Sequence, residues 1–329
     1  MERVISGIRP TGNLHLGNYF GAVKSFVQMQ NEYDCMFFIA DWHSLTTHPK
    51  PENIRNSART ILCEYLACGI NPEIAPIYVQ SDVKQVLELY LYLNMNAYLG
   101  ELERVTSFKD KARKQPDNVN AGLLTYPTLM AADILMHKAD KVPVGKDQEQ
   151  NMEMARLFAR RFNRIYDVDY FKEPESFYFN AKAVKVPGLD GSGKMGKSEG
   201  NCIYLCDSEE AIRKKVMRAV TDAGPTMLNQ EKPEVIQNLF TLMELVSDKQ
   251  TYDYFNDQYN NMAIRYGDMK KQLAQDINAF CAPIREKIVA YQNDDEYLAK
   301  VLRLGAERAS ERAEKTLEDV RQIIGFRRI

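Results

Sequence analysis

Short apolar runs alternate with longer stretches of helical periodicity through the first half of this chain. The predicted strands are 4–8, 35–40 and 77–79, and the helices between them are 19–31 and 51–68. The run 35–40 is apolar throughout, which is typical of a strand that is buried on both faces of a parallel sheet. This β-α-β-α-β order predicts an α/β fold with a doubly wound, Rossmann-like parallel sheet.

The middle of the chain continues with helical patterns at 86–98 and 121–137. Between them, residues 105–119 are strongly polar, and we interpret this stretch as a mobile or partner-binding insertion. Its basic residues are Lys109, Lys111, Arg113 and Lys114. A candidate strand at 141–144 and a helix at 148–162 complete this part.

The pattern changes after residue 187. Five glycines fall within 187–201, a density that predicts a loop, and a strand-like stretch, 202–205, follows it. The remaining helical patterns are 209–220, 233–246, 252–266, 269–291 and 296–324. We therefore predict a first domain at 1–204, with a helical segment inserted at about 82–140 and the loop at 187–201. A helical domain at 205–329 follows, and its last helix could pack back on the first domain.

Composition limits the classes of protein to which the chain can belong. Its 329 residues are 45% hydrophobic and 27% charged, as in ordinary globular proteins, and the net charge is −2. No global positive field attracts nucleic acid, so any RNA contact must use local patches. We see no signal-peptide pattern and no apolar run near the about 18–20 residues needed to span a bilayer, which predicts a cytoplasmic protein.

Cysteine and histidine spacing predicts no metal site. None of the six cysteines forms C-x-x-C, and the four histidines form no H-E-x-x-H or comparable pattern. Reduced, buried thiols are the expected state of the cysteines.

The first candidate site is the turn 10–18, between the first predicted strand and the first helix. A doubly wound fold binds ligands at this position, and Gly12 and Gly17 would let the backbone approach a nucleotide. His15 and Asn18 could donate hydrogen bonds to phosphate oxygens at a helix N-terminus. An ordinary turn capped by Asn18 is the alternative.

The second candidate site is Lys194–Ser198, where two lysines and a serine lie in the glycine-rich loop. A mobile, basic loop can close on a pyrophosphate that gains negative charge as it leaves. The alternative is a solvated basic loop. Residues 191–198 also satisfy the P-loop pattern G-x-x-x-x-G-K-S. That mechanism needs a strand before the motif and a helix after it, and here the strand-like 202–205 follows instead.

The third candidate site is one helix face that carries Met130, Asp133 and His137. A carboxylate on so apolar a helix is either salt-bridged or bound to a ligand donor, and an i,i+4 pair of Asp133 with His137 is the alternative. Downstream, 144–148 closes a strand and opens a helix, which is again a position for ligand contacts.

Together these segments resemble the class I aminoacyl-tRNA synthetases. His15-Leu16-Gly17-Asn18 is similar to the HIGH signature of that class, and Lys194-Met195-Gly196-Lys197-Ser198 is similar to KMSKS. Within the class, the chain resembles the bacterial type of tryptophanyl-tRNA synthetases. The segments that carry this second resemblance are 6–12, 100–104, 121–127, 130–135 and 142–148. Asn18 and Gly196 depart from the family signatures, which bears on the rate of catalysis or on the closure of the loop.

The resemblance implies a role for individual residues. Those implied to bind ATP are Arg9, Pro10, Thr11, Gly17, Asn18, Gly145, Lys146, Asp147, Val186, Lys194, Met195, Gly196, Lys197 and Ser198. Those implied to act in catalysis are His15, Asn18, Lys194, Lys197 and Ser198. Asp133 would accept the indole N–H of tryptophan, and Gln148, Met130 and His43 would border the amino acid.

The resemblance also implies the reaction and the partners. L-tryptophan and ATP, with Mg²⁺ carried on ATP, would form tryptophanyl-adenylate and pyrophosphate. The acyl group would then pass to the 3′ end of tRNA(Trp). A homodimer is implied, with no membrane or DNA partner and with the anticodon bound by 205–329. Phosphate contacts there would come from Arg213, Lys214, Lys215 and Arg218, for which a solvated helix face is the alternative.

Three other functions remain open at this stage. A tyrosyl-tRNA synthetase is possible because the hydroxyl of tyrosine could also donate to Asp133. The other two are a P-loop NTPase and a non-catalytic RNA-binding paralogue. The presence of both Lys194 and Lys197 disfavours the non-catalytic paralogue.

Overall fold

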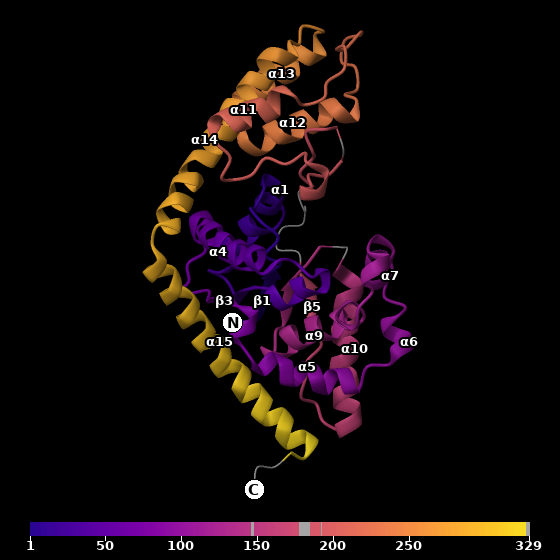
Figure 1. The fold of residues 1–329 in the computed structure, drawn as a ribbon. Helices are drawn as coiled ribbons and strands as arrows, with labels where there is room; N and C mark the ends of the chain where they lie inside the picture. Colours follow the sequence, from indigo (N-terminus) through magenta and orange to yellow (C-terminus); the bar gives the residue numbers. More distant parts are fainter. Residues whose placement is uncertain (146–147, 178–184, 192, 327–329) are drawn as a thin grey trace.

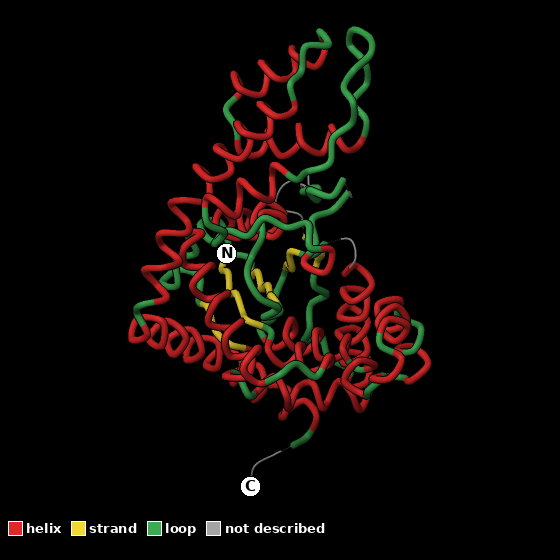
Figure 2. The backbone as a smooth tube through the Cα atoms, turned by 45° about the horizontal axis from the view of Figure 1, so that its top comes forward, coloured by secondary structure: helices red, strands yellow, loops and turns green. Residues whose placement is uncertain are grey.

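A parallel sheet lies at the centre of the protein in the computed structural model, which describes residues 1–145, 148–177, 185–191 and 193–326. Within these residues the sheet has five strands in the order β3-β2-β1-β4-β5. The strands are β1 (Arg3–Ile8), β2 (Asp34–Ile39), β3 (Ile77–Val79), β4 (Lys141–Pro143) and β5 (Glu175–Phe177). Every strand pair is parallel, and helices surround the sheet (Figure 2). The predicted doubly wound α/β fold is confirmed.

Ten α-helices cover or extend the sheet within the described residues before 185. They are α1 (Leu16–Asn18), α2 (Lys24–Met29), α3 (Asp41–Ser44), α4 (Pro51–Cys68), α5 (Gln85–Met95), α6 (Leu99–Leu102), α7 (Thr106–Lys114), α8 (Ala121–Leu124), α9 (Tyr126–Met136) and α10 (Glu149–Tyr166). A π-helical turn, Tyr19–Val23, joins α1 to α2. Short 3₁₀ turns follow at Leu45–Thr47, Gln80–Asp82, Pro116–Asn118 and Lys197–Glu199.

Strand β2 is apolar from Cys35 to Ile39 because both of its faces are buried. Cys35, Phe37 and Ile39 point into one hydrophobic cluster, whereas Met36 and Phe38 point into a second cluster. Successive side chains of a strand face opposite sides of the sheet, so both faces of β2 are buried. The sequence pattern and the two-sided core therefore have the same cause.

The remaining helices form the C-terminal part, shown in orange and yellow in Figure 1. They are α11 (Glu209–Met217), α12 (Glu234–Val246), α13 (Lys249–Asn260), α14 (Tyr266–Gln292) and α15 (Asp295–Ile324). Helix α15 passes the edge strand β3 so closely that a Cβ on Gly305 would lie 1.9 Å from the carbonyl oxygen of Ile77. Only glycine allows this approach, which holds the last helix against the sheet.

One prediction of local structure needs correction, and two elements were not predicted. Strand β5 was not predicted, because an edge strand that pairs only with β4 needs no continuous apolar run. Residues 202–205 form no strand but a single bridge from Tyr204 to His15. The polar stretch 105–119 contains a regular helix, α7, although nothing in its composition marks a buried face.

Other general predictions can be compared with the described residues. All six cysteines are free thiols; Cys35, Cys63, Cys202 and Cys281 are buried, whereas Cys68 and Cys206 are only half-buried. No three His, Cys, Asp or Glu side chains gather as a metal cluster in the described ranges. In the same ranges, no helix is both long enough and apolar enough to cross a membrane.

Candidate active site

The turn after β1 is closed by a reciprocal pair of hydrogen bonds. Nδ1 of the His15 ring accepts from the backbone N–H of Asn18 at 3.3 Å, and Oδ1 of Asn18 accepts from the backbone N–H of His15 at 3.1 Å. This is the arrangement of a capping box at the start of α1. Since Nδ1 is an acceptor, the neutral ring carries its proton on Nε2 and can donate from there.

His15 is held neutral by its surroundings. His15 is only 6% exposed. Burial, together with the positive charges of Lys197 and Lys194, lowers the pKa of its ring to about 4. Gly17 makes room for the ring, because a Cβ at this position would lie 2.8 Å from ring atoms of His15. The side chain is therefore a fixed hydrogen-bonding group near neutral pH and carries no charge.

The lysine loop reaches this turn through Lys197. Its Nζ donates to the carbonyl oxygen of Gly12 at 2.9 Å and to that of Thr11 at 3.4 Å. The stretch that follows the loop also bonds to the turn, since the backbone N–H of Leu16 donates to the carbonyl oxygen of Ile203 at 3.0 Å. The structure thus brings together two candidate sites whose residues lie 185 positions apart.

Asn201 organises the lysine loop from within. Its amide nitrogen donates to Oδ1 of Asp190 at 2.9 Å and to the carbonyl oxygen of Lys194 at 3.2 Å, while its Oδ1 accepts from the backbone of Gly196 at 2.9 Å. The residue is buried. Sequence reasoning missed it, and the available signal was a polar residue between a glycine-rich loop and an apolar run.

Met195 and Val186 are also placed together. The backbone N–H of Met195 donates to the carbonyl oxygen of Val186 at 2.8 Å, and both side chains are buried in the same hydrophobic cluster. No α-helix follows the loop before α11, so the context that the P-loop pattern requires is missing within the described part of the chain.

A buried glutamate lies beneath the turn. Glu64 on α4 accepts from the backbone N–H of Leu14 at 2.8 Å through Oε2, and its Oε1 is buried without a hydrogen-bond partner. Burial raises the pKa of Glu64 to about 8, although the hydrogen bond from Leu14 and the charge of Lys197 oppose this shift. Sequence reasoning missed Glu64, which was detectable as a single acidic residue inside an apolar helical run.

Asp133 is the centre of a second buried cluster. His43 Nε2 lies 2.7 Å from Oδ2 of Asp133, and the amide nitrogen of Gln80 donates to Oδ1 at 2.8 Å and to Oδ2 at 2.9 Å. His43 follows β2 and Gln80 follows β3, so the carboxyl ends of neighbouring strands deliver both partners. Gln80 was missed, although it directly follows a predicted strand.

The alternative pairing of Asp133 with His137 is wrong. Nε2 of His137 lies 3.0 Å from the hydroxyl of Tyr78, and burial lowers the pKa of this histidine to about 3. Around the Asp133 cluster, Nδ1 of His43 and Oε1 of Gln80 are buried with no hydrogen-bond partner. The cluster therefore retains hydrogen-bonding capacity for a ligand.

Lys111 is a basic residue of α7 that points inward. Its Nζ lies 3.8 Å from the centre of the Tyr126 ring, and burial together with the charge of Arg9 lowers its pKa to about 8. The ring of Tyr126 also packs edge-on against His43 at 4.6 Å between centroids. The predicted insertion thus supplies a cation between the turn and the Asp133 cluster, which its polar composition did not reveal.

The remaining predicted site residues lie around these clusters. Met130 is half-buried on α9, and Gly145 accepts at 2.9 Å from the backbone of Gln148 at the start of α10. Lys146 and Asp147 lie outside the described residues, as does the side chain of Ser198.

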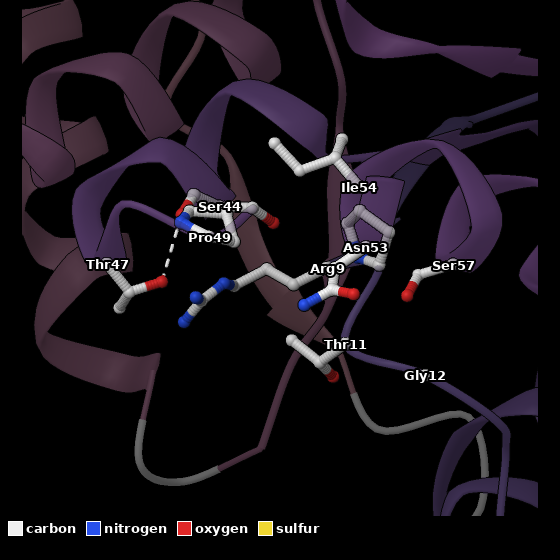
Figure 3. Close-up of a pocket in the computed structure, with 10 residues that line it drawn as sticks. Arg9, Thr11, Gly12, Ser44, Thr47, Pro49, Asn53, Ile54 and Ser57 are labelled. Carbon is white, nitrogen blue, oxygen red and sulfur yellow. Dashed lines mark hydrogen bonds between the residues drawn. The ribbon is translucent and has the colours of Figure 1, made fainter. Parts of the chain in front are cut away.

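A pocket of about 280 Å³ opens beside the turn (Figure 3). Its lining residues are Arg9, Pro10, Thr11, Gly12, Ser44, Thr47, Pro49, Asn53, Ile54 and Ser57. Arg9 extends across the pocket toward Thr47, and the residues of α4 form the opposite wall. The pocket therefore joins the end of β1 to the first turns of α4.

The chain has close relatives among known proteins. Residues 1–282 match the family described as "tRNA synthetases class I (W and Y)". The chain is 72% identical to the tryptophan–tRNA ligase of Porphyromonas gingivalis, over 99% of this chain and 100% of that one. Identity to the corresponding ligase of Rickettsia conorii is 40%, over 99% of both chains. The tryptophanyl-tRNA synthetase of Campylobacter jejuni, solved with ADP and tryptophan, is 35% identical with a TM-score of 0.88, over 98% of this chain and 99% of that one.

Proposed function

This chain belongs to the class I tRNA synthetases for tryptophan and tyrosine, and we propose that its two buried clusters divide the substrates between them. The reaction is that of a tryptophan–tRNA ligase, which consumes ATP. In our proposal, the turn Arg9–Asn18 and the lysine loop hold ATP, and the Asp133 cluster holds tryptophan. The observation that carries this proposal is the contact of Lys197 with the turn.

Adenylation needs no nucleophile from the protein. The tryptophan carboxylate attacks the α-phosphate of ATP, and pyrophosphate leaves, so the protein contributes position and charge stabilisation. Lys197 would leave the carbonyl oxygens of Gly12 and Thr11 for the phosphates, which gain negative charge in the transition state. Neutral His15 would donate a hydrogen bond through Nε2. Mg²⁺ would arrive on the phosphate oxygens of ATP, which are ligands that this ion prefers.

Selection of tryptophan follows from the acceptor capacity of Asp133. A carboxylate offers about four acceptor positions, and hydrogen bonds from His43 and Gln80 occupy three. The remaining position suits the indole N–H. Phenylalanine has no such donor. Sites built on a buried polar partner discriminate against analogues that lack the donor by a factor of roughly 10⁴–10⁵ in kcat/KM.

An amino-acid panel in ATP–pyrophosphate exchange tests this proposal. Tryptophan should support exchange, whereas tyrosine and phenylalanine should give rates near the background. Equal exchange with tyrosine would contradict the role of Asp133. Rapid hydrolysis of GTP in the absence of any amino acid would instead support the P-loop alternative.

A homodimer is the assembly that the surface favours. Helix α5 and the start of α6 expose a row of large apolar side chains, which are Leu87, Leu91, Met95, Tyr98 and Leu99. Leu87, Leu91 and Met95 recur every four residues, so they share one helix face. Such a face is typical of an interface between identical subunits. Replacement of Leu91 and Met95 by Glu should convert a dimer to a monomer in light scattering, and an unchanged mass would exclude this face.

The helical part at 205–329 is proposed to bind the anticodon of tRNA, with 1–204 as the catalytic domain. Of the four basic residues predicted to contact phosphate, Arg213, Lys214 and Arg218 are exposed. Lys215 forms an ion pair with Asp207 at 2.5 Å, so the first three are the better candidates. A cytoplasmic location is proposed because this is where tRNA is charged. Alanine at Arg213 and Lys214 should weaken tRNA binding without changing the exchange rate.

A further inference from the structure

Two side chains from distant elements bind the backbone of the same short turn. Nζ of Lys197, in the lysine loop, donates to the carbonyl oxygen of Gly12 at 2.9 Å. Oε2 of Glu64, on α4, accepts from the backbone N–H of Leu14 at 2.8 Å. Gly12 and Leu14 are two positions apart, so a cation and an acid share one strip of backbone.

The carboxyl group of Glu64 is more than the N–H of Leu14 requires. The residue is fully buried, and its Oε1 has no hydrogen-bond partner among the described residues. A neutral acceptor would bind one backbone N–H at a lower cost of desolvation. Glu64 and Lys197 also act on each other through their charges. Burial raises the pKa of Glu64 to about 8 and lowers the pKa of Lys197, while the charge of each partner opposes the shift.

This attraction couples the proton on Glu64 to the place of Lys197. When Lys197 leaves the turn for the phosphates of ATP, an ionised Glu64 loses its favourable neighbour, so its affinity for a proton rises. By linkage, Lys197 leaves a neutral Glu64 more easily than an ionised one. The neutral form of Glu64 is therefore the form that suits a movable lysine.

The other titratable groups around Glu64 keep their charge near neutral pH. Cys63 and Cys68 lie on the same helix, and Cys206 follows the stretch that bonds to the turn. Burial raises the pKa of all three thiols, that of Cys206 to about 11, so they stay protonated. His15 in the turn stays neutral because its pKa is about 4.

We propose that Glu64 is a positioning residue for the adenylation reaction: its ionised carboxylate holds the ammonium group of Lys197 on the turn, and its neutral carboxyl group releases that ammonium group to the phosphates. Glu64 touches no substrate in this proposal and acts through Lys197. The inference rests on the proposed function, which assigns Lys197 to the pyrophosphate that leaves.

The pH profile of exchange in the full-length enzyme tests this role. The rate for Glu64→Gln divided by the wild-type rate should rise about five- to tenfold between pH 6.5 and pH 9, because only the wild type becomes ionised. The change should lie in kcat, with KM for tryptophan equal in the two enzymes. Burial also lowers the pKa of Lys111 to about 8, but this lysine is present in both enzymes and cancels in the ratio. Glu52→Gln, exposed on the same helix, should give a constant ratio.

A second variant separates the charge of Glu64 from its hydrogen bond. Glu64→Leu removes the titration and also leaves the N–H of Leu14 without an acceptor. Its exchange rate should be lower than that of Glu64→Gln by a factor that does not change with pH. A factor that changed with pH would assign the titration to another group and would overturn the proposal.

The lysine itself supplies the third comparison. In a Lys197→Ala background, the ratio of Glu64→Gln to Glu64 should stay constant with pH, because the group through which Glu64 acts is missing. A ratio that rose equally with and without Lys197 would overturn the proposal. A ratio that stayed constant in the presence of Lys197 would overturn it as well.

Urea unfolding measures the pairing without any substrate. In a double-mutant cycle of Glu64→Gln and Lys197→Ala, the coupling should be near zero at pH 6 and favourable at pH 9. A missing coupling at pH 9 in an active enzyme would overturn the role of Glu64 alone. A coupling at pH 9 in a protein without tryptophan-dependent exchange would instead overturn the proposed function, and the catalytic role of the pair with it.

Discussion

The two buried clusters differ in how their charges are balanced. Asp133 is 3% exposed and receives three hydrogen bonds of 2.9 Å or less from His43 and Gln80. Lys197, in contrast, is half-buried and rests on two backbone carbonyl oxygens, with no carboxylate among its hydrogen-bond acceptors in the described residues. Helices and strand ends supply the residues of the Asp133 cluster, whereas a glycine-rich loop supplies Lys197.

This difference matches the two tasks proposed for the clusters. Selection between amino acids benefits from a partner whose orientation is fixed before binding, because little reorganisation is then needed. Stabilisation of a leaving pyrophosphate requires a cation that can follow charge as it develops and then release the product. Carbonyl oxygens hold Lys197 in place without neutralising it, so the cation remains available.

Removal of the movable cation should have the largest effect. Lys197→Ala is expected to lower the rate of tryptophan-dependent exchange by about 10²–10³, the usual loss when one stabilising group of the transition state is deleted. The affinity for tryptophan should not change. Steady-state exchange kinetics would measure both quantities. Lys24→Ala, an exposed lysine on α2, serves as the control, and an unchanged kcat in Lys197→Ala would remove the lysine from the mechanism.

Loss of the fixed charge should come next. Asp133→Asn keeps the shape but presents an amide group to two donors, so kcat/KM for tryptophan should fall by about 10² while KM for ATP stays constant. The protein should also lose about 1–3 kcal/mol of stability, because buried partners are left unsatisfied. Urea unfolding and exchange kinetics give the two values. Asp140→Asn, which disturbs a carboxylate bonded to Arg3 and Lys172, provides the comparison. A parallel rise in KM for ATP would argue against separate clusters.

The glutamate beneath the turn should make the stability of the protein sensitive to pH. The pKa of Glu64 is raised from 4.5 to about 8, so the native state binds its proton more tightly than the unfolded chain. The free energy of unfolding should therefore fall as the pH rises from about 5 to about 8, and the loss should be complete above this range. Glu64→Gln retains an acceptor for the N–H of Leu14 and removes the titration.

Urea unfolding between pH 5 and pH 9 would measure this effect. The variant should gain stability over wild type across that window, by on the order of a few kcal/mol. Glu52→Gln, an exposed glutamate on the same helix, should follow the wild-type curve. Parallel curves for wild type and Glu64→Gln would show that this carboxyl group does not titrate in the folded protein.

The smallest effect concerns the departure from the family signature in the loop. A Cβ on Gly196 would lie 3.5 Å from Cγ of Glu199, an ordinary contact, and the φ of Gly196 is −147°, which other residues adopt freely. Gly196→Ser should therefore fit without strain and change the exchange rate by less than about threefold. Stopped-flow measurement of adenylate formation would detect a change of this size. A tenfold change would mean that glycine at this position governs closure of the loop.

Much of the fold was predictable from the chain, because local patterns and fold geometry agree. The apolar run of β2 reflects burial on both faces, and the boundaries of α4 follow from Pro51 at its start and Gly69 after its end. The edge strand β5 and helix α7 were missed, since neither depends on a pattern that is visible within its own residues. The turn, the lysine loop and Asp133 were located from residue types that suit phosphate and donor binding.

The sequence by itself determined strands β1 to β4, the helical C-terminal part and which segments carry the chemistry. Only the tertiary structure decided which groups meet. Asp133 pairs with His43 and Gln80 instead of His137, because the ends of β2 and β3 converge beside α9. Glu64 takes its role from the backbone of the distant Leu14, and Asn201 takes its role from the backbone of its own loop. Backbone N–H and C=O groups are the same in every residue, so no sequence pattern records which of them a buried side chain will bind.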